Sequence, residues 1–155
     1  MFAPGAAHFS FVTPKLPTMK RFYMGALGAE LIGEDRGRCE MQLHGHQLIL
    51  REGGPDVEPA ETRSISLAIA DQPHQGLVVT REELRRLEER CRDDACPMTE
   101  RVVRRRGTPF EHECFFVLDP DGRLWEVKAF GRSGAACAVE LTDEEVRPTR
   151  SSLDH

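Results

Sequence analysis

Several features are missing from this chain of 155 residues, and each absence narrows the range of functions. No apolar run is long enough to cross a bilayer, so the sequence predicts no membrane-spanning segment. The 21 Lys and Arg residues are outnumbered by 26 Asp and Glu, so we expect no basic face for nucleic acid or anionic lipid. Residues 1–7 have no basic start and are too short for a secretory signal. We therefore expect a cytoplasmic protein whose partner is a small molecule.

A regular cysteine framework is also missing. The five cysteines are an odd number and include no CxxC pair, which favours a reduced protein. Cys114 lies in an apolar run and is expected to be a small core residue. Cys91 and Cys96 flank the end of a predicted helix, where they would ligate a metal only if other ligands joined them.

What the chain does contain is one order of elements repeated twice, within a length and a 39% hydrophobic content typical of a single domain. In the first copy a strand at 8–13 precedes a helical pattern at 19–27. Three extended segments separated by glycine turns follow at 30–33, 38–43 and 47–51.

The second copy has the same order. A strand at 74–80 leads into a helix that Thr80 can cap, with Leu84, Leu87 and Cys91 on one stripe. Extended segments follow at 100–104, 113–118 and 124–130. The polar stretch between the copies is expected to be a connector, with a partial strand at 65–70.

Three potential metal ligands are attached to these strands: His8 and His74 begin equivalent strands of the two copies, and Glu126 interrupts the apolar run 124–130. A carboxylate in such a run is costly to bury unless it is paired or bound to a cation. Two imidazoles and one carboxylate that meet form a facial set that leaves metal positions open. Each residue alone has a simpler explanation, as a solvated strand end or the wet face of a strand.

Over residues 7–130 the chain resembles the vicinal oxygen chelate superfamily of glyoxalases, bleomycin-resistance proteins and dioxygenases. The resemblance is carried by the order and spacing of short segments, namely HFSF before KRFY and LG, then GHQL, HQGLVV, and LDPDG before LWEVK.

The resemblance implies an α+β fold of two pseudo-symmetric βαβββ modules that form a cup-shaped, mainly antiparallel sheet of eight strands. Module one would cover about 7–52, the connector 53–73 and module two about 74–130, within one domain over 1–130. The tail 131–155 lies outside the resemblance, and we expect much of it to be disordered.

For function, the resemblance implies a metal-dependent, dioxygenase-like enzyme acting on a substrate with vicinal oxygens. The metal, Fe(II) first with Mn, Zn or Ni as alternatives, would be held by His8, His74 and Glu126. His112 is the first candidate for a general acid or base and His46 the second. Ile49 falls where module two has Glu126, so module one offers no fourth ligand unless His44 or His46 substitutes from an adjacent position. Similar proteins are commonly homodimers, with or without swapped modules.

Two departures from the extradiol pattern keep other functions open. The only tyrosine is Tyr23, on the first helix, where we expect it to be packed rather than catalytic. The run Arg101 and Arg104–Arg106 fits either an anionic substrate or a solvated edge. The alternatives are a glyoxalase-like isomerase or lyase, a thiol transferase, and a protein that only sequesters a drug.

Overall fold

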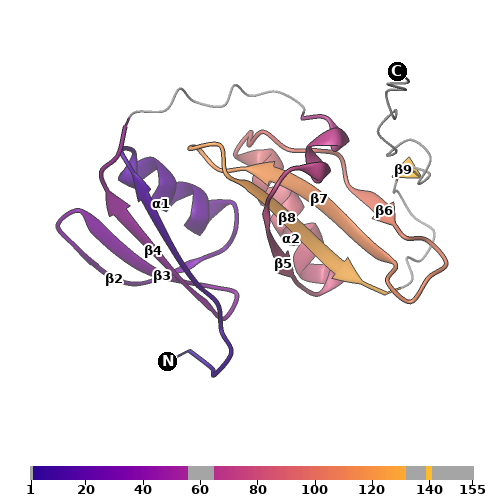
Figure 1. Cartoon of the computed structure of the whole chain (residues 1–155), viewed down its shortest axis with the longest axis horizontal. Coiled ribbons are helices and arrows are strands. Elements are labelled where there is room, and N and C mark those ends of the chain that lie inside the picture. The colour runs from indigo at the N-terminus through magenta and orange to yellow at the C-terminus, as the bar shows by residue number, and fades with distance from the viewer. Residues whose placement is uncertain (1, 56–64, 132–138, 141–155) are drawn as a thin grey trace, which may run out of the picture.

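The structure is a computed structural model that describes residues 2–55, 65–131 and 139–140. The first module contains strand β1, helix α1 and three further strands, as the sequence predicted. Its sheet has the order β1-β4-β3-β2, in which β1 runs parallel to β4 and the other pairs are antiparallel (Figure 1). The elements are β1 (His8–Thr13), α1 (Leu16–Gly25), β2 (Glu30–Asp35), β3 (Arg38–Leu43) and β4 (His46–Glu52).

The second module repeats this arrangement, with sheet order β5-β8-β7-β6-β9 and β5 parallel to β8. The elements are β5 (Gln75–Val78), α2 (Arg81–Asp93), β6 (Val102–Arg104), β7 (His112–Leu118), β8 (Leu124–Phe130) and β9 (Val139–Glu140). Thr80 caps α2 as predicted, because its hydroxyl accepts a hydrogen bond from the Glu83 N–H at 3.2 Å. The predicted α+β fold of two βαβββ modules is confirmed, and its strands form two separate sheets that do not close on one another within the chain.

The segment expected to be a partial strand at 65–70 is instead a 3-10 helix, η1 (Leu67–Asp71). The Ser66 side chain accepts a hydrogen bond from the Ala68 N–H, which favours a turn over an extended chain. Its apolar side chains then cover Phe116 and Leu124 on one face of the second sheet. Most of the tail predicted to be disordered lies outside the described residues.

Strand register makes the internal symmetry explicit. In module one Ser10 pairs with Ile49, and in module two Gly76 pairs with Glu126. His8 and His74 each lie two residues before these paired positions. The two histidines are therefore structurally equivalent, and so are Ile49 and Glu126.

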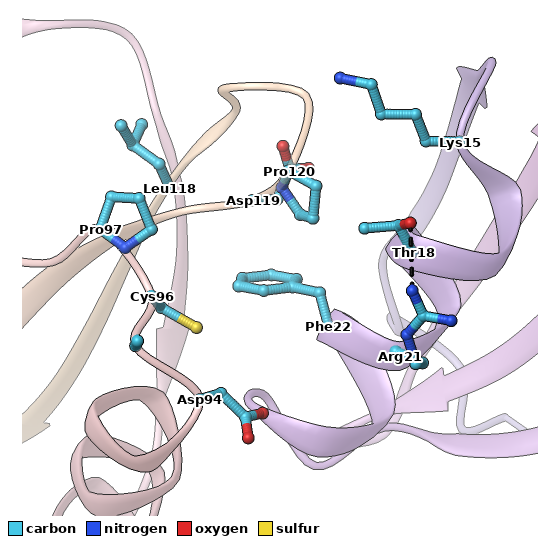
Figure 2. A pocket seen from close by; sticks show the side chains of 11 residues that line it. Lys15, Thr18, Arg21, Phe22, Asp94, Cys96, Pro97, Leu118, Asp119 and Pro120 are labelled. Carbon is cyan, nitrogen blue, oxygen red and sulfur yellow. Dashed lines mark hydrogen bonds between the residues drawn. The ribbon is translucent and has the colours of Figure 1, made fainter. Parts of the chain in front are cut away.

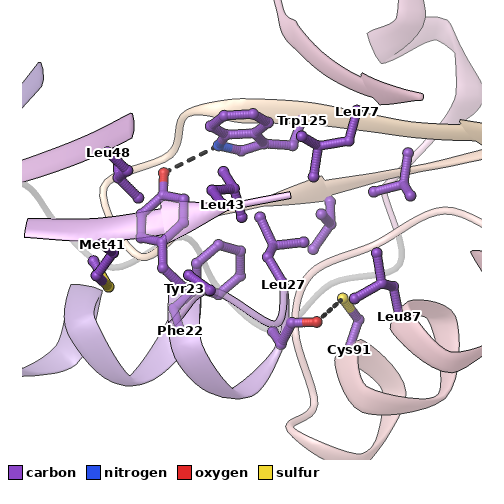
Figure 3. Close-up of a cluster of buried hydrophobic side chains, with 14 of the residues drawn as sticks. Phe22, Tyr23, Leu27, Met41, Leu43, Leu48, Leu77, Leu87, Cys91 and Trp125 are labelled. Carbon is purple, nitrogen blue, oxygen red and sulfur yellow. Dashed lines mark hydrogen bonds between the residues drawn. The ribbon is translucent and has the colours of Figure 1, made fainter. Parts of the chain in front are cut away.

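The modules lie side by side and share one hydrophobic core, to which both helices contribute (Figures 1 and 3). Tyr23, fully buried, donates a hydrogen bond to Asp119 Oδ2 at 2.7 Å and accepts one from Trp125 Nε1 at 3.0 Å. Phe9 and Phe11 of β1 pack edge-on against the same Trp125 ring. Tyr23 is thus a packed residue that ties module one to module two, as the sequence analysis expected.

Candidate metal centre

The second sheet carries a cavity of about 330 Å³ on the face opposite α2. Strand alternation explains its lining, because His112 and Phe116 of β7 and Glu126 and Lys128 of β8 share that face. His74, just before β5, reaches the cavity from the neighbouring edge. The lining residues are Ala70, His74, Arg104, Arg105, Phe110, His112, Phe116, Glu126, Lys128 and Phe130.

Glu126 is the centre of this group and is only 5% exposed. Its carboxylate lies 2.7 Å from Lys128 Nζ, 3.3 Å from His74 Nε2 and 3.7 Å from His112 Nε2. Burial by itself would raise the pKa of Glu126, but the neighbouring His112 ring and the Lys128 ammonium outweigh burial and lower it to about 2. The site therefore holds a buried carboxylate that is ionised at neutral pH and lies among nitrogen donors.

Hydrogen bonds fix the orientation of the two histidine rings in the cavity. The Nδ1 atoms of His74 and His112 lie 2.7 and 2.8 Å from the carbonyl oxygens of Gln72 and Phe110. A carbonyl only accepts, so Nδ1 must carry the proton, and in the neutral ring Nε2 then presents a lone pair. Both Nε2 atoms face the Glu126 carboxylate, which is unfavourable unless a proton or a metal cation lies between them.

His8 shows the same arrangement in module one, with Nδ1 2.7 Å from Gln47 Oε1. The other two described histidines of that module differ. His44 uses Nε2 to donate to the Leu27 carbonyl at 2.8 Å, and His46 uses Nδ1 to accept from the Ala7 N–H at 2.9 Å. Of these three, only His8 therefore turns an Nε2 lone pair outward.

Within one chain the structure brings together three of the five residues named from the sequence. His74, His112 and Glu126 share the cavity, whereas His8 and His46 lie in module one and are not among its lining residues. His8 is exposed at the start of β1, and His46 packs edge-on against Phe9. These positions follow from the two-sheet architecture, because equivalent residues of the two modules lie on different sheets.

Sequence reasoning missed two residues at the site, Cys114 and Lys128. Cys114, assigned to the core, is fully buried, yet it also forms a compact group with His112 and Glu126, whose potential ligand atoms all lie within 4.8 Å of one another. Burial, followed by the nearby Glu126 charge, raises the pKa of Cys114 to about 12, so it stays a thiol at neutral pH. Lys128 lines the cavity, as does Arg104 of β6, which the sequence analysis already connected with an anionic substrate. The sequence did contain a signal for Cys114 and Lys128. Alternate side chains of β7 and β8 point to the same face of the sheet, and these side chains share the face of Glu126.

Arg101, grouped in the sequence with Arg104, has a different role. It donates to Glu88 at 2.9 Å and to Glu113 at 2.6 Å on the helix side of the sheet. Within the basic run, Arg101 therefore belongs to a buried ion-pair network, whereas Arg104 and Arg105 line the cavity.

A family model described as the Glyoxalase/Bleomycin resistance protein/Dioxygenase superfamily matches residues 5–127. The chain belongs to this superfamily. That agrees with the resemblance found in the sequence and with the paired modules. No curated protein matches the chain.

Solved structures show the same fold at low sequence identity. A glyoxalase/bleomycin resistance protein/dioxygenase from Alicyclobacillus acidocaldarius has 22% identity and a TM-score of 0.61, covering 84% of this chain and 95% of that one. The fosfomycin resistance protein FosX from Mesorhizobium loti has 17% identity and a TM-score of 0.58, with coverages of 84% and 95%. A mutant FosX from Listeria monocytogenes, complexed with Mn(II) and 1S,2S-dihydroxypropylphosphonic acid, has 18% identity and a TM-score of 0.57, with coverages of 81% and 90%. Among the described residues, no helix is both long and apolar enough to span a membrane.

Proposed function

We propose that the protein is a metal-dependent enzyme that activates a small substrate through two adjacent oxygen atoms. The observation that supports this most directly is the orientation of His74, whose Nε2 lies 3.3 Å from the carboxylate of the buried, ionised Glu126. A divalent cation fits a donor set of an imidazole nitrogen and a buried carboxylate. Bound there, the metal would act as a Lewis acid that lowers the pKa of substrate oxygens.

The ligands in this proposal are His74 and Glu126 of one chain and His8 of a second copy. His8 has the required lone pair but lies in the other module, so one chain alone leaves the set incomplete. Strands β1 and β5 are both edge strands of their sheets. Each also exposes a valine at an equivalent position, Val12 at 52% and Val78 at 65%. Unpaired edges with exposed apolar side chains favour association, so a homodimer that joins module one of one copy to module two of the other would complete the site.

The remaining cavity residues have roles that follow from their chemistry. His112 is the proposed general acid or base, because its ring lies at the carboxylate and is held by one hydrogen bond. Arg104, Arg105 and Lys128 make the cavity cationic, which favours a substrate that carries negative charge. Phe110, Phe116 and Phe130 supply an apolar wall against which a small molecule can pack. His46 holds the Ala7 backbone, so the chain gives it no comparable role at this site.

Two finer functions are compatible with this site. One is the Fe(II) dioxygenase that the sequence suggests, which cleaves a substrate next to its paired oxygens. The cationic cavity favours the second, a lyase, isomerase or transferase that uses Mn(II) or a similar ion on an anionic substrate. Oxygen uptake by the Fe(II)-loaded protein with a catechol supports the first, while turnover of a phosphonate epoxide with Mn(II) and no oxygen uptake supports the second.

A mixing experiment tests the site before any substrate is known. We expect His8→Ala and Glu126→Gln each to abolish tight Mn(II) or Fe(II) binding, measured anaerobically by calorimetry. If ligands come from two copies, unfolding and refolding a mixture of both variants restores about a quarter of the sites, because half of randomly paired dimers contain one intact combination. A mixture that regains no site contradicts the shared arrangement.

The same measurement separates the enzyme from a protein that only sequesters a drug. Wild-type protein that takes up no divalent metal overturns the proposal. The control is His44→Ala, because His44 donates through Nε2 to the Leu27 carbonyl and is not a proposed ligand. Its metal affinity should equal that of the wild type.

A further inference from the structure

A second cavity, of about 560 Å³, lies between the two modules, where α1 faces the end of α2 and the β7–β8 hairpin (Figure 2). It contains none of the proposed metal ligands. Its walls include Phe22 and Pro97, and its charged groups are Lys15 and Arg21 from the first module and Asp94 and Asp119 from the second. The Cys96 side chain projects from the second module toward this space (Figure 2).

The end of α2 places a second thiol next to Cys96. The Cys96 N–H donates to the Cys91 carbonyl at 2.9 Å and the Ala95 N–H donates to the Arg92 carbonyl at 3.0 Å. Ala95 has a left-handed conformation, with φ of 51°. These are the bonds of a Schellman motif, in which the side chains of the third-last helical residue and the second residue past the cap contact each other. Here both residues are cysteines.

The two thiols are chemically unequal. Cys91 is fully buried, and its Sγ lies 3.8 Å from the Ala26 carbonyl (Figure 3), whereas Cys96 is half-buried at the cavity wall. The adjacent Cys91 side chain lowers the pKa of Cys96, and the same contact, followed by burial, raises the pKa of Cys91. An accessible thiol that ionises readily beside a buried thiol that does not is the arrangement of a nucleophilic and a resolving cysteine.

We propose that Cys96 and Cys91 form a dithiol site that reduces small disulfides bound in the cavity between the modules. The Cys96 thiolate attacks one sulfur of the disulfide, which forms a mixed disulfide and releases one thiolate that takes up a proton. Cys91 then loses its proton and attacks Cys96 Sγ, which releases the second thiol and forms the Cys91–Cys96 disulfide. One disulfide and two protein thiols thus become one protein disulfide and two small thiols.

The cavity selects among small disulfides by size and charge. Its volume suits a molecule of a few residues, and Arg21 offers a cation to a carboxylate while Asp94 offers an anion to an ammonium group. Oxidised glutathione, which carries several carboxylates, is a suitable probe. Cys39 and Cys114 are buried, and among the described residues neither lies beside another thiol, so they provide internal controls.

The test treats the reduced full-length protein with oxidised glutathione and maps each cysteine by mass spectrometry after alkylation and digestion. We expect the Cys91–Cys96 disulfide to form in the wild type at least about 10-fold faster than any modification of Cys39 or Cys114. In Cys91→Ala, the product should stop at a glutathionyl adduct on Cys96. Cys91→Ser serves the same purpose should the alanine variant fail to fold.

A second comparison tests the role of charge. Arg21→Met should slow the reaction with oxidised glutathione about threefold relative to cystamine, a cationic disulfide, while Arg85→Met on the exposed face of α2 leaves the ratio unchanged. The proposal is overturned if Cys96 reacts no faster than Cys39, if Cys91→Ala traps no adduct, or if Arg21→Met leaves the ratio as in the wild type. Metal binding is read separately, so failure here leaves the proposed function untouched.

Discussion

The open faces of the two sheets have the same geometry but different chemistry. Equivalent strand positions hold His8 and His74, yet the next equivalent pair is Ile49 in module one and Glu126 in module two. Module one consequently shows an exposed imidazole on a face with no proposed carboxylate ligand, and module two has a cavity around an ionised carboxylate. The repeat determines which strand positions are equivalent, and the residue type at each position determines whether it can bind a metal.

The layers behind the two sheets differ as well. Beneath the first sheet, α1 buries Met19, Phe22 and Tyr23, which pack without an ion pair. Beneath the second, Glu88 of α2 is buried and shares Arg101 with Glu113 of β7. One module is held by apolar packing, whereas the other includes a buried charge network.

Breaking that network should give the largest effect on stability. Replacing Arg101 by Met removes the common cation of Glu88 and Glu113, which keep only Arg92 at 3.1 Å and Arg81 at 3.8 Å, and we expect a loss of about 3 kcal/mol in the free energy of unfolding. Chemical denaturation measures the change. Arg85→Met, which removes an exposed arginine from α2, is the control and should cost less than about 0.5 kcal/mol. A loss no greater than that of the control would show that the network contributes little.

The second-largest effect concerns metal affinity and compares the equivalent positions Ile49 and Glu126. Glu126→Gln should weaken Mn(II) binding more than about 100-fold, because ligands matter more than the groups that support them. Ile49→Val at the equivalent position should leave the affinity unchanged. Calorimetry under anaerobic conditions measures both. Equal affinities in the two variants would remove Glu126 from the metal site.

The contact between the modules should give an intermediate effect. Tyr23→Phe removes a hydroxyl that donates to Asp119 and accepts from Trp125, leaving both groups buried without this partner. We expect a loss of about 1–3 kcal/mol in stability. Phe22→Leu, on the same helix but without a polar group, tests packing alone. Thermal denaturation of both variants distinguishes the hydrogen bonds from the packing. If Tyr23 acts only through packing, the two variants should lose similar amounts of stability.

Lys128 and Arg51 are also equivalent, two residues beyond Glu126 and Ile49. Lys128 Nζ lies 2.7 Å from the Glu126 carboxylate and competes there with any other cation. Lys128→Met should therefore tighten Mn(II) binding about 10-fold, or about 1.4 kcal/mol. Arg51→Met should not change it. Weaker binding in Lys128→Met would instead show that the ammonium supports the site.

The smallest effect concerns acid stability. The pKa of Glu126 is about 2 in the folded protein and 4.5 for an unperturbed glutamate, so its ionised form stabilises the fold above pH 4.5. That stabilisation is lost as the pH falls toward 2. Wild-type protein should therefore lose on the order of 1 kcal/mol more than Glu126→Gln between about pH 5 and about pH 3. Denaturation at both pH values tests this, and parallel losses would contradict the depressed pKa.

The sequence alone determined the modules and their elements. Strands at 38–43 and 124–130 were predicted to the residue, because alternation and turn residues are local signals. The segment at 65–70 was predicted wrongly, since a short apolar run does not distinguish a strand from a 3-10 helix until its capping and packing are known. Equivalence of His8 and His74 was also visible in the repeat.

Tertiary structure decided which of these residues meet. His74, His112 and Glu126 converge because β5, β7 and β8 belong to one sheet, while His8 lies on the other sheet of the same chain. The ring orientations of His74 and His112 depend on backbone carbonyl partners that no spacing reveals. The contact between Cys91 and Cys96 likewise needed the backbone turn after α2. Local pattern fixes the elements, but chemistry at a site depends on pairing and hydrogen bonds between distant segments.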